Sequence, residues 1–414
     1  MIRAPVGFFL VWRHHVSSIA CMLWSSPTRR QDEYSWISKR PLREIVRRSS
    51  CHYMPQSNYN PALSGNPQSA TSQQYPNGNP DVRYNPPGAK NTDSAVPLHR
   101  MEEVVHNYNC EESAPGNIAF RWLYGSNVAA LNRDPRIQVV QYNEDTFILR
   151  QNVCVHWEAP FTYLLFGNNG SLLIDTGATA DAPWYPLRAT VDAIVTRWSQ
   201  MRRKKSVPLT VALTSGEDVA QNQGLVQFSG RPATTLAPQP LTAMKRFYKL
   251  NDSWPSGSGR IDLGDRIVDV IPAPGAHKDG VVFYDSYTDF LFTGDLIFPG
   301  KINIGNDKDY VASLTRLRRW KEAHPVKWLM GGHIEMQFVP GKAYPRFATY
   351  KPYERLLQME PNLLDDALAS AQEVVGKEMA LVRPDFILLN RVSPDQKTPV
   401  FPEGVPNINA PRPF

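Results

Sequence analysis

The chain has 414 residues, of which 42% are hydrophobic, and a formal net charge of +6. Residues 1–50 contain nine Lys/Arg and three Asp/Glu, a balance of +6 that accounts for the whole net charge. The rest of the chain is therefore formally neutral, which argues against a nucleic-acid-binding domain there. The four cysteines are widely spaced and include no C-x-x-C pair, so they predict neither a disulfide framework nor a structural zinc module.

Residues 1–53 form a basic N-terminal extension. Its apolar stretch from Val6 to Trp12 is too short to cross a bilayer, and we expect no membrane association. The extension contains no defined targeting signal, so a cytoplasmic location is expected. Its Arg- and Ser-rich, acid-poor composition also resembles an organellar transit peptide, which is the alternative. A third interpretation is a mis-annotated start, with Met54 as the true first residue.

Three further regions follow from composition. Residues 54–97 are rich in Asn, Pro, Gln, Ser and Gly and poor in aliphatic side chains, so they are expected to form a disordered linker. The folded domain is predicted over residues 98–390. A Pro-rich tail, residues 391–414, ends the chain.

Within the predicted domain, short apolar runs alternate with helical patterns. Residues 163–166 and 172–175 flank a Gly-Asn-Asn-Gly turn and predict a β-hairpin. A helix is predicted from Pro183 or Pro186 to the basic cluster at residues 202–205. Further strands are predicted at 207–213, 266–271, 281–284, 290–292 and 326–330, and further helices at 220–228, 309–323 and 361–376. This alternation predicts a layered α/β domain with the sheets inside and the helices outside.

Three short motifs place a His or an Asp directly after a predicted buried strand. They are the segment Pro274–Gly280, which contains His277, then Thr293-Gly294-Asp295, and then Gly331-Gly332-His333. Side chains that follow neighbouring strands emerge together at one edge of a sheet. Imidazole and carboxylate groups gathered in this way are typical metal ligands, so the motifs predict a hydrolytic metal site.

Together with the hairpin ending in Leu173-Ile174-Asp175-Thr176-Gly177, these motifs resemble the metallo-β-lactamase fold superfamily in order and spacing. The resemblance covers about residues 140–336. It implies a four-layer αββα sandwich with one or two metal ions, usually zinc, at one edge of the paired sheets. It also implies that Asp175 orders nearby loops, that His277 binds the first metal, that Asp295 bridges both metals and that His333 binds the second. The resemblance also implies that a bridging Asp, in place of the Cys of many true β-lactamases, favours the glyoxalase II-like and broader hydrolase branch of the family.

The first family motif, His-x-His-x-Asp-His, is largely absent. Its place is taken by the segment from Thr214 to Val219, in which only Asp218 is a plausible ligand and Glu217 a reserve. We therefore predict one divalent ion rather than two, bound by Asp218, His277, Asp295 and His333. Zinc is expected, with iron or manganese as alternatives. Asp218 or Glu217 is the candidate general base if it does not bind the metal.

Each residue also has a structural alternative. Ser215-x-x-Asp218 matches a capping box at a helix start, His277 beside Lys278 fits a solvated turn, and Asp295 and His333 fit ordinary turn and loop positions. His156, beside a tryptophan, is interpreted as a packed loop residue.

The main functional hypothesis is a metal-dependent hydrolase that cleaves a small ester, thioester or amide with a metal-bound hydroxide. Its expected partner is a small-molecule substrate, and we expect it to bind neither nucleic acid nor a membrane. The alternative is a catalytically inactive relative retained as a binding or scaffold module. A third explanation is a sequence error that shortened the segment from Thr214 to Val219.

Overall fold

The computed structural model describes residues 103–119, 121–216 and 220–392. The predicted N-terminal extension, the linker and almost all of the predicted tail lie outside these residues, and so do Glu217 and Asp218. Within the described part, no helix is both long enough and apolar enough to cross a membrane.

Two six-stranded sheets make up the centre of the fold. The first has the strand order β1 (Ile137–Asn143), β2 (Thr146–Gln151), β3 (Phe161–Phe166), β4 (Ser171–Ile174), β5 (Leu209–Ala212), β6 (Thr234–Leu236). The second has the order β13 (Gln358–Met359), β12 (Trp328–Gly331), β10 (Phe290–Gly294), β9 (Val281–Asp285), β8 (Ile267–Pro272), β7 (Gly259–Asp262). A third, small sheet has the order β11 (Lys301–Ile304), β15 (Ile387–Asn390), β14 (Met379–Val382).

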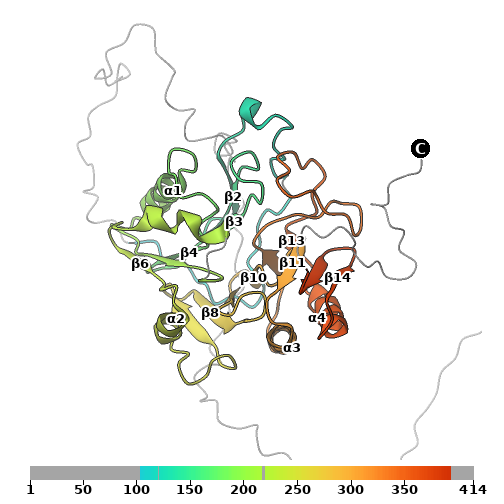
Figure 1. Cartoon of the computed structure of the whole chain (residues 1–414). Helices are drawn as coiled ribbons and strands as arrows, with labels where there is room; N and C mark the ends of the chain where they lie inside the picture. The colour runs from blue at the N-terminus through green and yellow to red at the C-terminus, as the bar shows by residue number, and fades with distance from the viewer. Residues whose placement is uncertain (1–102, 120, 217–219, 393–414) are drawn as a thin grey trace, which may run out of the picture. The chain divides into compact units, whose positions relative to one another are not determined.

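The helices lie on the outer faces of the two large sheets (Figure 1). α1 (Leu187–Arg202) and the 3₁₀ helix η5 (Ala220–Phe228) pack on the first sheet. α3 (Asp307–Ala323) and α4 (Leu363–Val374) pack on the second. The short helix α2 (Leu241–Phe247) contributes Met244 to the core between the sheets, and a 3₁₀ turn, η4, spans Ala129–Leu131.

Side-chain alternation along β3 explains the layering. Tyr163 and Leu165 belong to the core shared with β8, β9 and β10, whereas Leu164 and Phe166 belong to the core under α1. Successive side chains of a strand point to opposite faces, so a strand buried on both faces is apolar throughout, as β3 is. The order of layers is therefore helix, sheet, sheet, helix.

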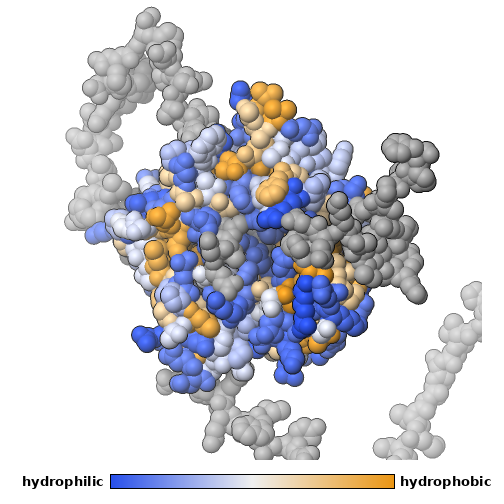
Figure 2. All heavy atoms as spheres, viewed as in Figure 1, coloured by the Kyte–Doolittle hydropathy of each residue, from blue (hydrophilic) through white to orange (hydrophobic). Residues whose placement is uncertain are grey.

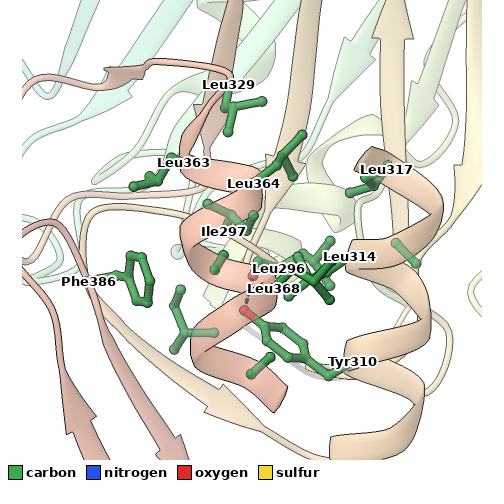
Figure 3. Packing of buried hydrophobic residues seen from close by; sticks show 14 of the residues in the cluster. Leu296, Ile297, Tyr310, Leu314, Leu317, Leu329, Leu363, Leu364, Leu368 and Phe386 are labelled. Atoms are coloured by element: carbon green, nitrogen blue, oxygen red, sulfur yellow. Dashed lines mark hydrogen bonds between the residues drawn. The ribbon is translucent and has the colours of Figure 1, made fainter. Parts of the chain in front are cut away.

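The core on the outer face of the second sheet is rich in leucine. Leu314 and Leu317 of α3 and Leu364 and Leu368 of α4 belong to this core, and Figure 3 shows these side chains in the space between the two helices. The Tyr310 hydroxyl donates to the Leu296 carbonyl oxygen at 2.8 Å, so the one polar atom of this ring has a partner. The core therefore connects α3 to the loop that follows β10.

The surface is mostly polar on the face in Figure 2, where hydrophilic residues predominate and apolar side chains form separate small patches. Isolated exposed apolar residues are normal for globular proteins, so we assign no function to these patches.

Most predicted elements are confirmed, with small shifts at their ends. The hairpin pairs β3 with β4, and the predicted helices at 309–323 and 361–376 correspond to α3 and α4. Residues 220–228 form a 3₁₀ helix where the pattern predicted a short helix of unspecified type. Nine further elements of the described residues were not predicted from the sequence: β1, β2, β6, β7, β11, β13, β14, β15 and α2.

Candidate active site

The site lies where three strands of the second sheet end. β10 runs parallel to β12, and β8 and β10 are each antiparallel to β9, so β8, β10 and β12 share one direction. His277 follows β8, Asp295 follows β10 and His333 follows β12. The three side chains therefore lie at one edge of the sheet, as the sequence pattern predicted.

Gly275 shapes the loop that carries His277. Its φ of +146° is rarely adopted by residues with a side chain. In this conformation its carbonyl oxygen accepts from the backbone N–H groups of Gly305 and Asn306, each at 2.9 Å. The loop is thereby held against the start of α3, and His277 is held at the sheet edge.

His277 and Asp295 form a direct pair. The Nε2 atom of His277 lies 3.3 Å from Oδ2 of Asp295, and each side chain is about one-fifth exposed, at 21% and 20%. Burial by itself raises the pKa of Asp295, but the hydrogen bond from His277 and the nearby His333 outweigh it, so the pKa is lowered overall. Asp295 is therefore ionised at neutral pH.

His333 lies in the same pocket but makes a different set of contacts. Its side chain is 7% exposed, its ring packs edge-on against Phe298 with centroids 4.0 Å apart, and its Nε2 atom lies 4.0 Å from Oε1 of Glu335. Neither ring nitrogen has a hydrogen-bond partner in the described structure. Buried polar atoms without partners are rare in folded proteins and often mark a position where a ligand or ion binds.

A side chain that the sequence analysis missed also contacts Asp295. The Nε2 group of Gln221, at the start of η5, donates a hydrogen bond to Oδ1 of Asp295. Gln221 is 2% exposed. The Asp295 carboxylate is therefore paired with the His277 imidazole through Oδ2 and with the Gln221 amide through Oδ1. No local sequence signal identified Gln221, because a glutamine in a polar loop has no motif of its own.

The pocket around these groups has a volume of about 240 Å³. Its lining combines apolar rings with charged groups of both signs: Trp157, Glu158, Gln221, Ala276, His277, Asp295, Phe298, Lys301, Asn303, His333, Glu335 and Arg346. Burial raises the pKa of Glu158, and its Oε2 atom has no hydrogen-bond partner among the described residues. His156 does not line this pocket, but its two successors in the sequence, Trp157 and Glu158, do.

The segment that replaces the family's first histidine motif begins in contact with the His277 loop. Ser215 Oγ and the Gly216 N–H each donate to the Asp279 carboxylate at 3.0 Å. The predicted ligand and base residues, Asp218 and Glu217, lie outside the described residues. The structure therefore describes three of the four predicted metal ligands.

A single divalent ion suits the chemistry of these three residues. Two imidazoles and one ionised carboxylate are common ligands of zinc and iron, and the free ring nitrogens of His333 fit a ligand role. In the described residues, however, no three His, Cys, Asp or Glu side chains already stand close enough to hold an ion.

Asp175 orders the loop beside the site, as predicted. Its carboxylate accepts from the Thr214 backbone N–H at 2.8 Å and from the Thr214 hydroxyl at 2.9 Å. Its φ is +62°, a conformation that Asn and Asp tolerate better than most residues. Burial raises the pKa of Asp175 to about 7, and the hydrogen bonds from Thr214 offset this only in part.

The raised pKa predicts a pH effect on stability that Asp175→Asn should remove. The folded chain keeps this proton up to about pH 7, whereas the unfolded chain releases it near its ordinary pKa of 3.8. The stabilisation from Asp175 is thus complete below the unfolded pKa and is lost as the pH rises through 7, by at most about 1.4 kcal/mol per pH unit. Urea unfolding at pH 5 and pH 8 should therefore show a larger loss of stability for the native chain than for the variant. Equal losses would contradict the assignment.

A family model matches part of the chain. Residues 216–361 match the model of the metallo-beta-lactamase superfamily, and this range contains His277, Asp295 and His333. The match spans 146 of the 414 residues. The architecture described above, with two mixed sheets flanked by helices, is the layered α/β arrangement that the sequence resemblance implied.

Individual relatives are distant. An acyl-coenzyme A thioesterase, MBLAC2, from Gallus gallus is 31% identical over 80 residues, which are 18% of this chain and 29% of that protein. This chain thus matches less than a third of the relative's length. A metallo-beta-lactamase from Pontibacter korlensis has 18% identity and a TM-score of 0.36 over 57% of this chain and 99% of that one. The DIM-1 metallo-beta-lactamase has 14% identity and a TM-score of 0.38 over 59% of this chain and 100% of that one. Superfamily members typically bind zinc.

Proposed function

We propose that the chain is a hydrolase that cleaves a small ester, thioester or amide in the pocket around His277, Asp295 and His333. The observation that supports this proposal is the convergence of two imidazoles and an ionised carboxylate, from three strand ends, in one cavity. The thioesterase relative makes acyl thioesters the first substrate class to test.

The proposal includes one divalent ion, zinc first and iron or manganese as alternatives. His277, Asp295 and His333 would hold it, with Asp218 as a fourth candidate outside the described residues. When bound, such an ion supplies Lewis-acid polarisation of the scissile carbonyl group.

The chain's own residues have separate tasks in this proposal. Trp157 and Phe298 give the pocket an apolar wall against which an acyl group can pack, and Lys301 gives it an ammonium group for an anionic part of the substrate. Glu158 keeps its proton more readily than an ordinary glutamate because burial raises its pKa. Its Oε2, which has no hydrogen-bond partner among the described residues and lies 3.9 Å from His156 Nδ1, is the candidate donor of a proton to the leaving group.

A second candidate function is ligand binding without catalysis. Two observations favour it: the Gln221 amide is bonded to Asp295, and no three potential ligands are assembled among the residues described. In this case the pocket would bind the same class of acyl compound but leave it intact.

Hydrolysis assays on the full chain separate the two functions. The purified chain is chelated, reconstituted with a saturating excess of zinc, manganese or ferrous iron, and assayed with short-chain acyl thioesters, p-nitrophenyl esters and anilides. We expect thioester turnover that disappears after chelation and returns with one of the three metals. Binding of these substrates by calorimetry without turnover under any metal condition would instead establish the non-catalytic function.

A further inference from the structure

Gln221 is held rigidly at the base of the pocket. Its backbone carbonyl oxygen accepts from the Thr176 N–H at 2.7 Å and from the Thr176 hydroxyl at 3.1 Å. Thr176 follows Asp175 at the end of β4, so the start of η5 is tied to the first sheet. A buried side chain on a backbone fixed in this way has little freedom to leave the pocket.

The amide of Gln221 fills a space next to the strand end that carries His333. A Cβ atom built on Gly332 would lie 2.9 Å from Nε2 of Gln221 and 3.1 Å from Oδ1 of Asp295. Gly332 therefore leaves room for the amide–carboxylate contact, and the amide packs against the residue directly before His333. Nε2 of Gln221 and Oδ1 of Asp295 therefore both lie beside Gly332.

A carboxamide N–H₂ group donates hydrogen bonds and does not bind metals, so its contact with Asp295 uses a lone pair that an ion would need. We propose that the Gln221 carboxamide competes with divalent cations for this site, by occupying Oδ1 of Asp295 beside the His333 strand end. This inference rests on the proposed function, because it takes His277, Asp295 and His333 as the ligands. It explains why these residues share a pocket without forming an assembled three-ligand group.

Zinc affinity measured on the full chain tests the proposal without any assay of activity. Competition with a chromophoric chelator and isothermal titration would compare the native chain with Gln221→Ala and Gln221→His. We expect weak zinc binding by the native chain and several-fold tighter binding by Gln221→Ala, which frees the carboxylate. Gln221→His adds an imidazole ligand and should bind zinc more tightly still than Gln221→Ala.

Gln223→Ala is the matched control, since Gln223 lies on the same 3₁₀ helix and is exposed. It should bind zinc as the native chain does. Adding Asp295→Asn to Gln221→His should remove the gained affinity, and circular dichroism of the metal-free proteins checks that each variant is folded.

The two proposals fail in different ways. If folded Gln221→Ala and Gln221→His bind zinc no more tightly than the native chain and the Gln223→Ala control, the competition proposal is wrong. If the native chain already binds one zinc tightly and Asp295→Asn removes it, the ligand assignment stands but Gln221 is no competitor. If Gln221→His gains zinc while the native chain hydrolyses no acyl substrate, the competition proposal stands and the hydrolase proposal fails.

Discussion

Asp295→Asn is expected to lower acyl hydrolysis by about 100-fold or more. The substitution keeps the shape of the side chain and the oxygen that accepts from Gln221, but it removes the negative charge that faces His277. Without that charge the site loses a metal ligand and the ionic partner of an imidazole. Kinetics on a short acyl thioester and elemental analysis of the same sample measure the two consequences separately.

A matched control for this experiment is Asp181→Asn. Asp181 is exposed, precedes α1 and does not line the pocket. It should keep native rates and native metal content. If Asp295→Asn keeps more than half of the native rate, Asp295 has no role in the chemistry and is a structural residue.

Arg266→Met is expected to cost about 3–5 kcal/mol in the free energy of unfolding. Arg266 and Asp285 are both 0% exposed, and the guanidinium donates to both carboxylate oxygens, at 2.9 and 2.6 Å. It also donates to the carbonyl oxygens of Asp145 and Phe166, at 2.7 and 2.9 Å. Removing the guanidinium leaves a buried carboxylate and two buried carbonyl oxygens without these donors, which is costly in a low-dielectric interior.

Arg260→Met is the matched comparison, because it removes an arginine that pairs with an aspartate at an exposed position. Arg260 is 66% exposed and lies 3.2 Å from Asp269, so its loss should change the free energy of unfolding by no more than about 1 kcal/mol. Urea or guanidinium unfolding, followed by circular dichroism, measures both variants. Similar values for the two variants would show that the Arg266 network contributes little to stability.

Arg266 precedes β8, at the end of the strand opposite to the end that His277 follows. Asp145 and Phe166 belong to the first sheet and its connections, so the guanidinium joins the two sheets on the edge away from the pocket. Its loss should therefore affect stability more than chemistry. The Asp295 variant thus tests the chemistry at one edge of the sandwich, and the Arg266 variant tests the stability contributed by the opposite edge.

Local pattern was enough to predict the elements nearest the site. The apolar runs that became β8, β10 and β12 have distinct ends, and the motifs follow those ends directly. The position of His277, Asp295 and His333 at one edge followed from this, because strands that share a direction in one sheet end at the same edge. The β3–β4 hairpin was also predictable from its turn and its flanking leucines.

β2 and the third sheet were missed by the local pattern. β2 is buried along its whole length but includes Arg150 and Gln151, which a local pattern assigns to the surface. Arg150 is buried because Glu354, 204 residues away in the chain, accepts from its guanidinium at 2.7 and 2.6 Å. The third sheet likewise pairs β11 with β15, and the two strands are distant in sequence.

The sequence by itself determined which residues with metal-binding chemistry follow which strands, because hydrophobic periodicity and turn chemistry act over a few neighbouring residues. Only the tertiary structure decided what those residues contact: His277 and Gln221 on the two oxygens of Asp295, and His333 without a partner in the described structure. These contacts depend on how β4, β8, β10 and β12 pack together, and on the space left by Gly332. Such contacts join segments far apart in the chain, so no local window of sequence contains them.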